Sequence, residues 1–218
     1  MTTNVYIIRH GEARCNVDGI VGGLRGCQGL TERGHEQVAL LAGRLRAGEI
    51  KADVIYGSTF RRARETAEGV AGALERPIEW DDAFQEIRPG EADGLTYADA
   101  RERFHIPGRD PVYEPLSPDG ESWSAFFGRV GQAFTRVLRQ HEGRNIVIAA
   151  HGGIIEASFY YFLGMPVSVV RNTSFWVHHT SITQWRQGGP AHDQRWYLVR
   201  YNDVAHLDPQ MLASTEPL

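Results

Sequence analysis

Two short apolar segments of this chain end in the same way, with a histidine followed by a glycine. The segments are residues 4–8 and 145–150, and the residues that follow them are Arg9-His10-Gly11 and His151-Gly152-Gly153. Open α/β sheets bind their ligands in the crevice at the carboxyl ends of the strands. We therefore expect both histidines at one edge of one sheet, in a shared site. The arginine beside the first histidine indicates that this site holds an anion.

The pattern of apolar residues predicts strands that alternate with helices. The expected strands are 4–8, 53–56, 78–80 and 145–150, and the expected helices are 31–47, 63–74, 96–104, 123–138 and 153–163. Strand-like alternation returns at 174–186 and 195–201, which we interpret as additions to the sheet. This order predicts the α/β class, as a three-layer αβα sandwich with a mostly parallel central sheet and helices on both faces.

The length of 218 residues fits one large α/β domain. We predict a single domain over residues 1–207, with a lid-like insertion at 81–120 that is polar and rich in proline, and a loosely held tail at 208–218. Residues 13–30 are rich in glycine and are expected to form an irregular loop. Because long structureless loops are uncommon unless they serve a function, this loop is a candidate part of the site.

The composition argues against several classes of partner. The net charge is −4 and no run of lysine or arginine occurs, so neither nucleic acid nor an anionic membrane surface is expected as a partner. No apolar stretch approaches the roughly 20 residues that span a bilayer, and the N-terminus enters a strand at once, unlike a signal peptide. Cys15 and Cys27 are too few for a disulfide framework. We expect a cytoplasmic protein, and the sequence leaves open whether it forms a homodimer.

The residues at the two strand ends have the chemistry of a phosphate site. A neutral imidazole at His10 is a competent nucleophile toward phosphorus, and the planar guanidinium of Arg9 binds phosphate oxygens in pairs. His151 would donate a hydrogen bond to a phosphate oxygen, and the glycines after it open a helix, whose N-terminus favours anions. Taken alone, each motif is explained at least as well by a polar strand end or by a histidine hydrogen-bonded to the backbone.

Two further residues are candidates on weaker grounds. Arg62 lies in the first turn of the helix that follows the strand at 53–56, and hence near a third strand end. An exposed helix charge explains this arginine equally well. Ester hydrolysis also needs an acid to protonate the leaving oxygen, and Glu86 precedes a glycine-containing turn. With 27 acidic residues in the chain, composition does not select Glu86.

The motifs decide the question together, because they occur in one order along the chain. In sequence they are Ile7-Ile8-Arg9-His10-Gly11-Glu12, Asn16, Leu30-Thr31-Glu32-Arg33-Gly34, Ser58, Arg62-Ala63, Thr66-Ala67, Glu86, His151-Gly152-Gly153, Asn202-Asp203 and His206-Leu207. This ordered set resembles the histidine phosphatase superfamily, which has the phosphoglycerate mutase-like fold. The resemblance extends from residue 5 to about residue 207.

The resemblance implies a role for each candidate. His10 matches the nucleophile that becomes phosphohistidine, and Glu86 falls where many members keep the general acid. The residues that match phosphate-holding positions are Arg9, Asn16, Arg62, His151 and the following Gly152. The family's core chemistry needs no metal, so neither a metal nor another cofactor is expected. The implied activity is that of a phosphomonoesterase acting on a small phosphorylated metabolite, a small-molecule phosphate ester.

Two alternatives lie within the family. A cofactor-dependent phosphoglycerate mutase uses the same nucleophile, but the sugar-phosphate mutases that the chain resembles are usually longer, with an added basic segment after the acid. Here residues 97–120 are short, proline-rich and mixed in charge, which favours hydrolysis. A non-catalytic member with a retained phosphate pocket is the other alternative. Such a protein would keep the same arginines and histidines in its pocket but would not turn over a substrate.

A metal-dependent hydrolase is the alternative from another class. The chain has nine histidines, but neither a His-x-x-x-His helical pair nor a cysteine cluster occurs. The adjacent His178 and His179 would point to opposite faces if their segment is a strand. The pattern therefore gives little support for a metal site.

Overall fold

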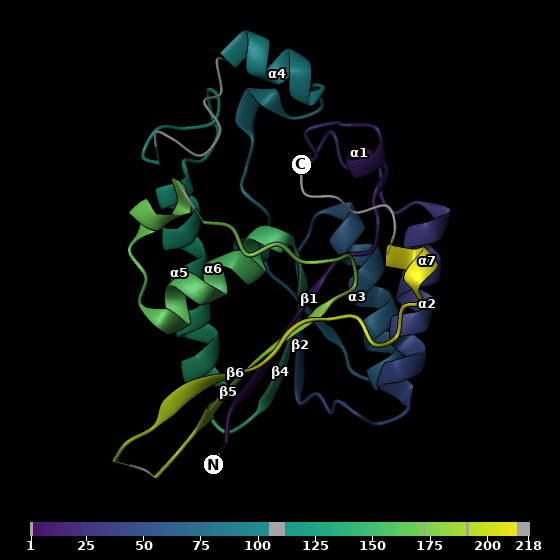
Figure 1. Cartoon of the computed structure of the whole chain (residues 1–218), viewed down its shortest axis with the longest axis vertical. Helices are drawn as coiled ribbons and strands as arrows, with labels where there is room; N and C mark the ends of the chain where they lie inside the picture. The colour runs from purple at the N-terminus through teal and green to yellow at the C-terminus, as the bar shows by residue number, and fades with distance from the viewer. Residues whose placement is uncertain (1, 105–111, 172, 191, 213–218) are drawn as a thin grey trace.

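The structure, a computed structural model, describes residues 2–104, 112–171, 173–190 and 192–212. A sheet lies at its centre (Figure 1). It has six strands, in the order β3-β2-β4-β1-β5-β6. In chain order the strands are β1 Asn4–Arg9, β2 Val54–Gly57, β3 Ile78–Trp80, β4 Asn145–Ala150, β5 Ile182–Gly188 and β6 Arg195–Asp203. The four strands expected before residue 151 all form, within a residue of their expected bounds.

The sheet is mixed rather than uniformly parallel. β1 pairs with β4, β4 with β2, and β2 with β3, all in parallel, whereas β5 is antiparallel to β1 and β6 is antiparallel to β5. The expectation of one strand over 174–186 is wrong in its first half, because β5 begins only at Ile182. Thr180 has a positive φ of 55°, a left-handed conformation that interrupts an extended chain.

Helices cover both faces of the sheet, which confirms the three-layer arrangement. The helices α2 (Glu32–Arg46) and α3 (Arg61–Leu74) lie on one side, and α5 (Trp123–Gln140) and α6 (Gly152–Leu163) lie on the other (Figure 1). Thr31 caps the first of these, as its hydroxyl accepts a hydrogen bond from the Gly34 amide at 3.0 Å.

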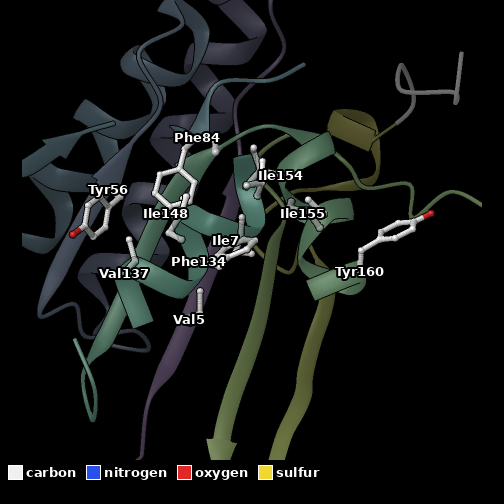
Figure 2. Close-up of a cluster of buried hydrophobic side chains, with 14 of the residues drawn as sticks. Val5, Ile7, Tyr56, Phe84, Phe134, Val137, Ile148, Ile154, Ile155 and Tyr160 are labelled. Atoms are coloured by element: carbon white, nitrogen blue, oxygen red, sulfur yellow. The ribbon is translucent and has the colours of Figure 1, made fainter. Parts of the chain in front are cut away.

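Alternate side chains of β1 enter two separate cores. Val5 and Ile7 belong to the core on the α5 and α6 side, and Tyr6 and Ile8 to the core beneath α2. Figure 2 shows the first core, where Val5, Ile7 and Ile148 of the sheet meet the helical side chains Phe134, Val137, Ile154 and Ile155. A strand buried on both faces is apolar at nearly every position, and this is why residues 4–8 give an uninterrupted apolar run.

The predicted insertion and the glycine-rich loop meet above the carboxyl ends of the strands. The insertion holds η1 (Asp82–Phe84), η2 (Gly90–Ala92) and α4 (Tyr97–Phe104), and part of it, 105–111, lies outside the described residues. The loop is not wholly irregular as expected, since α1 (Arg14–Val17) forms within it. The Asp93 carboxylate accepts hydrogen bonds from three amides of the loop, those of Gly23, Arg25 and Gly26. These bonds join the two segments.

Two short helical segments also follow α6. A 3-10 helix, η3, spans Val167–Arg171, and a short helix, α7, spans Pro209–Leu212. The carbonyl oxygens of Gln210 and Met211 accept hydrogen bonds from Arg33 and Gln37 of α2, so the described part of the predicted tail is tied to that helix. Residues 213–218 of the tail lie outside the described residues. In the part of the chain that the structure describes, every helix is too short or too polar to cross a bilayer.

Candidate active site

Three strand ends converge because their strands are parallel neighbours. Arg9, the last residue of β1, is opposite Ala150, the last residue of β4, so His10 and His151 leave the sheet side by side. Their ring centroids are 5.2 Å apart. Gly57, the last residue of β2, is paired with Ala149, and the chain then enters α3 with Arg62 in the first turn. The expected meeting of both histidines with Arg62 is what the sheet order produces.

The turn after β1 approaches α2 so closely that two glycines are needed. A Cβ atom on Gly11 would lie 2.6 Å from the Gly34 oxygen, and one on Gly34 would lie 2.1 Å from the Glu12 oxygen. The amide of Gly11 also donates to the Thr66 hydroxyl at 3.1 Å, one helical turn beyond Arg62. Backbone packing and this bond fix the position of His10 relative to Arg62.

His10 is a neutral imidazole whose ring proton is fixed on one of the two nitrogens. Its side chain is buried, and Nδ1 lies 2.7 Å from the Gly11 carbonyl oxygen, which can only accept. Nδ1 therefore carries the proton, and the lone pair of Nε2 accepts a hydrogen bond from Arg62 Nε at 3.0 Å. Burial, followed by the positive charge of Arg62, lowers the pKa of His10 well below its usual value. The ring is thus uncharged at neutral pH, and its Nε2 lone pair is engaged by Arg62.

His151 is fully buried and is oriented by Ser58. The Ser58 hydroxyl oxygen lies 2.8 Å from Nε2, and the same oxygen is 3.4 Å from the Phe60 amide, which donates to it. Where the Ser58 hydroxyl donates to Nε2, the ring proton is on Nδ1, an atom without a partner among the described residues. Burial and then Arg62 and Arg9 lower the pKa of His151 well below its usual value.

Two arginines bring positive charge to the site. Arg62 is almost fully buried, and its Nη1 donates to the Gly22 carbonyl at 2.6 Å. Arg9 donates through Nη1 to the Val177 carbonyl, and its Nε has no partner among the described residues. Burial lowers the pKa of Arg9 to about 10, and Glu86 acts in the opposite direction. Both side chains are cations at neutral pH, so the site is prepared for an anion.

Glu86 lies against the N-terminus of α6. Its carboxylate accepts hydrogen bonds from the amides of Gly153, at 2.9 Å, and Ile87, at 3.1 Å. A Cβ atom on residue 153 would lie 2.0 Å from Glu86 Oε1, so the carboxylate can take this position only beside a glycine. Sequence reasoning assigned the amides of this helix start to a bound anion. One of them, that of Gly153, donates to Glu86 instead.

A hollow of about 260 Å³ opens beside these groups. Its walls include Arg9, Asn16, Glu86 and Gly152, and Asn16 Oδ1 has no partner among the described residues. Arg62 and Glu86 both line a neighbouring hollow of about 320 Å³. The seven candidates from the sequence are therefore gathered in one region, where His10 and His151 are the most deeply buried.

A third histidine lies at the site and was missed by sequence reasoning. The ring centroid of His179 is 5.7 Å from that of His10, and the side chain is 4% exposed. Neither ring nitrogen has a partner in the described part of the chain. The left-handed Thr180, whose amide donates to the Arg9 carbonyl at 3.1 Å, ties this segment to the end of β1. No local pattern marks this contact, whereas His178 turns away and bonds to Asn202.

The buried histidines should make folding stability depend on pH. Burial lowers the pKa of His10, His151 and His179 well below the usual value, which is about 6.5 in an unfolded chain. Below that pH the unfolded state binds more protons, so stability is complete above about pH 6.5 and is lost as the pH falls. Each such histidine contributes a slope of up to about 1.4 kcal/mol per pH unit.

Urea unfolding between pH 8 and pH 5 measures this dependence. A His179→Gln variant should lose the contribution of one histidine, so its free energy of unfolding should fall less steeply than that of the unaltered protein. The expected difference in slope is about 1.4 kcal/mol per pH unit. Equal slopes for the two proteins would contradict the assignment of His179 as a buried, neutral ring.

Within residues 2–104, 112–171, 173–190 and 192–212, no three histidine, cysteine, aspartate or glutamate side chains gather so as to hold a metal ion. The two cysteines are free thiols, and both are buried.

Comparison with known proteins gives one consistent family. The sequence matches the family model of the histidine phosphatase superfamily, branch 1, over residues 5–204. A 2,3-bisphosphoglycerate-dependent phosphoglycerate mutase of Brucella canis is 32% identical over 167 residues, which cover 72% of this chain and 80% of that protein. The match therefore includes most of both chains.

Solved structures share the fold over nearly their whole length. Bacillus stearothermophilus YhfR superposes with a TM-score of 0.80 at 30% identity, over 94% of this chain and 98% of that one. Phosphoserine phosphatase from Entamoeba histolytica, in complex with 3-phosphoglyceric acid, gives a TM-score of 0.74 at 26% identity, again over 94% and 98%. The similar proteins thus include both a named mutase and a named phosphatase.

Proposed function

The chain belongs to the histidine phosphatase superfamily, branch 1, and we propose that it hydrolyses small phosphomonoesters through a phosphohistidine on His10. The observation that carries this proposal is the state of the His10 ring. It is buried and neutral, its proton is on Nδ1, and its Nε2 lone pair is 3.0 Å from the guanidinium Nε of Arg62. A nucleophile with a fixed tautomer beside a phosphate-binding cation is what covalent phosphoryl transfer requires.

In the first step, Arg62 moves its hydrogen bond from His10 to a phosphate oxygen. The freed Nε2 lone pair attacks phosphorus in line with the ester bond, a P–N bond forms, and the P–O bond to the alcohol breaks. Glu86 donates a proton to the departing oxygen. Arg9, Arg62 and His151 stabilise the charge that spreads over the phosphoryl oxygens, and such positioning and charge stabilisation supply most of the rate in phosphoryl transfer.

In the second step, water replaces the alcohol. The Glu86 carboxylate takes a proton from the water, whose oxygen attacks phosphorus while the P–N bond breaks. Inorganic phosphate leaves, and His10 returns to its neutral form with the proton on Nδ1. Glu86 lines both neighbouring hollows, which is the position from which one carboxylate can serve the alcohol and the water in turn.

A phosphoglycerate mutase activity is the second candidate, because a relative that is 32% identical carries that name. Incubation with 3-phosphoglycerate and a trace of 2,3-bisphosphoglycerate, followed by phosphorus NMR, separates the two. We expect inorganic phosphate from 3-phosphoglycerate or, in a parallel assay, from p-nitrophenyl phosphate. Formation of 2-phosphoglycerate without phosphate release would establish the mutase instead.

The same preparation tests whether the protein is a non-catalytic phosphate binder. Rapid acid-free quenching during turnover should trap a phosphoryl group that is labile in acid and stable in alkali, as phosphohistidine is. Activity should survive a chelator, since the proposed steps use only side chains of this protein and water. It should fall with vanadate, which resembles phosphate and would occupy the same site. Absence of both turnover and a trapped phosphoryl group on several substrates would favour the non-catalytic alternative.

A further inference from the structure

The hollow of about 320 Å³ adjoins the hollow that holds Arg9 and Asn16. Three residues line both of them: Glu86, Tyr97 and Trp123. Small-molecule sites in proteins begin at about 300 Å³, so the second hollow is large enough to take part of a substrate. We refer to it as the leaving-group hollow, for the reasons that follow.

The walls of the leaving-group hollow are mostly apolar. They are formed by Val21, Gly22, Arg62, Glu86, Ile87, Pro89, Ala92, Tyr97, Ala100, Arg101, Leu116 and Trp123. Of the three charged residues, Arg62 and Glu86 belong to the proposed chemistry, and Arg101 is exposed to solvent. The interior therefore offers hydrocarbon and aromatic surface to whatever enters it.

The position of Glu86 indicates which part of the substrate this would be. The first hollow is the more polar of the two, because its walls hold Arg9, Asn16, Ser174 and Glu156 beside the aromatic residues Tyr97, Trp123, Phe175 and Trp176. We assign the phosphoryl group to it because Arg9 and Asn16 can bind phosphate oxygens. Glu86 lies between the two, and in the proposed function it protonates the alcohol oxygen. An alcohol whose oxygen meets Glu86 has its carbon atoms on the opposite side from the phosphoryl group, which is the side of the leaving-group hollow.

A larger hollow nearby does not fit this role. It measures about 660 Å³, and its walls carry four carboxylates, those of Asp82, Glu91, Asp93 and Asp119, and two guanidinium groups, those of Arg25 and Arg88. Arg9, Arg62 and Glu86 are not among its lining residues. The net negative charge of this lining repels a phosphate ester. We therefore do not assign the alcohol part of the substrate to this larger hollow.

We propose that the substrate is a phosphomonoester of an apolar alcohol that carries about one ring, and that this ring enters the leaving-group hollow. This assignment rests on the proposed function and adds the substrate class. Burial of a phenyl-sized group stabilises binding about 10- to 100-fold, by the same effect that buries a phenylalanine side chain. A small polar alcohol gains nothing from these walls.

Two substrates that differ by one ring test the proposal. The protein is assayed with 2-phenylethyl phosphate and with ethyl phosphate, whose alcohols have similar acidity, so the intrinsic reactivity of the esters is matched. We expect kcat/KM to be about 10- to 100-fold higher for the phenylethyl ester. A ratio near one, or a higher kcat/KM for glycerol 3-phosphate than for the phenylethyl ester, would overturn the assignment.

Variants locate the effect within the structure. Leu116→Asn introduces a polar group into the leaving-group hollow, and the ratio between the two substrates should fall at least about threefold. Leu24→Ala is the control, because Leu24 is 71% exposed and lines the larger hollow instead. It should leave the ratio unchanged. A ratio that responds to Leu24 and not to Leu116 would place the ring in the larger hollow and overturn the proposal.

A binding measurement separates failure of this proposal from failure of the proposed function. Dissociation constants of both esters are measured by calorimetry with a His10→Ala variant, which should not turn them over. The phenylethyl ester should bind about 10- to 100-fold more tightly, whether or not the unaltered protein is a phosphatase. Equal dissociation constants would overturn the assignment of the hollow, whereas unequal constants without turnover in the unaltered protein would overturn only the proposed chemistry.

Discussion

Replacement of His10 by alanine is expected to lower phosphate release from p-nitrophenyl phosphate about ten-thousandfold or more. The variant keeps Arg9, Arg62 and His151, so it should still bind phosphate esters, but it lacks the lone pair that we propose attacks phosphorus. The measurement is the initial rate of p-nitrophenolate release, together with the amount of acid-labile phosphoryl group trapped on the protein. Both should fall to the background.

His35→Ala is the matched control for this loss. His35 lies on α2 with its side chain 60% exposed, and it takes no part in the site. This variant should keep the activity of the unaltered protein, which would show that loss of a histidine is not damaging in itself. If His10→Ala kept near-normal activity, the covalent mechanism would be wrong. A phosphoryl group found on His179, whose ring centroid is 5.7 Å from that of His10, would identify His179 as the nucleophile and leave the covalent mechanism in place.

Substitution of Arg62 by lysine is expected to lower kcat about a hundredfold or more, by analogy with the loss of single charge-stabilising donors in other enzymes. The guanidinium bonds to His10 Nε2 and to the Gly22 carbonyl at once, through Nε and Nη1. A lysine ammonium keeps the charge but loses this planar pair of donors, so it cannot stay anchored to the Gly22 carbonyl while its hydrogen bond passes from His10 to a phosphoryl oxygen. Steady-state kinetics with p-nitrophenyl phosphate measure the effect.

The adjacent arginine provides the control. Arg61 is exposed, and its guanidinium pairs with Glu65 one helical turn later. Such exposed pairs contribute little, about 0.5 kcal/mol or less. Arg61→Lys should therefore leave kcat unchanged within a factor of two. A kcat for Arg62→Lys within threefold of the unaltered protein would show that positive charge alone suffices at this position.

The parts of the fold that sequence reasoning predicted are those with strong local patterns. β1 and β4 are buried on both faces, and each contains a short apolar run, with a histidine directly after the strand. The convergence of His10 and His151 then followed from a general rule about parallel sheets. Arg62 and Glu86 had no such pattern, and only the ordered set of motifs selected them.

The features that were missed depend on contacts between distant segments. His179 lies beside His10 because Thr180 bonds to the carbonyl at the end of β1, and nothing near residue 179 indicates that partner. The amide of Gly153 was expected to face an anion, but it is occupied by Glu86, which is 67 residues earlier in the chain. Local periodicity carries no information on pairings of this kind. They become visible only when the sheet order is known.

The strand that precedes the proposed nucleophile is synthesised long before the two strands that pair with it. β1 pairs on one side with β4, where Asn4 meets Asn145, and on the other with β5, where Ile8 meets Ile182. A ribosome that adds ~5–20 residues per second needs on the order of ten seconds after the first strand emerges to make either partner. Throughout that interval an apolar segment with two unpaired edges is attached to a growing chain, and such segments aggregate unless they are covered. We therefore expect this protein to depend on chaperones during synthesis more than its modest size would indicate.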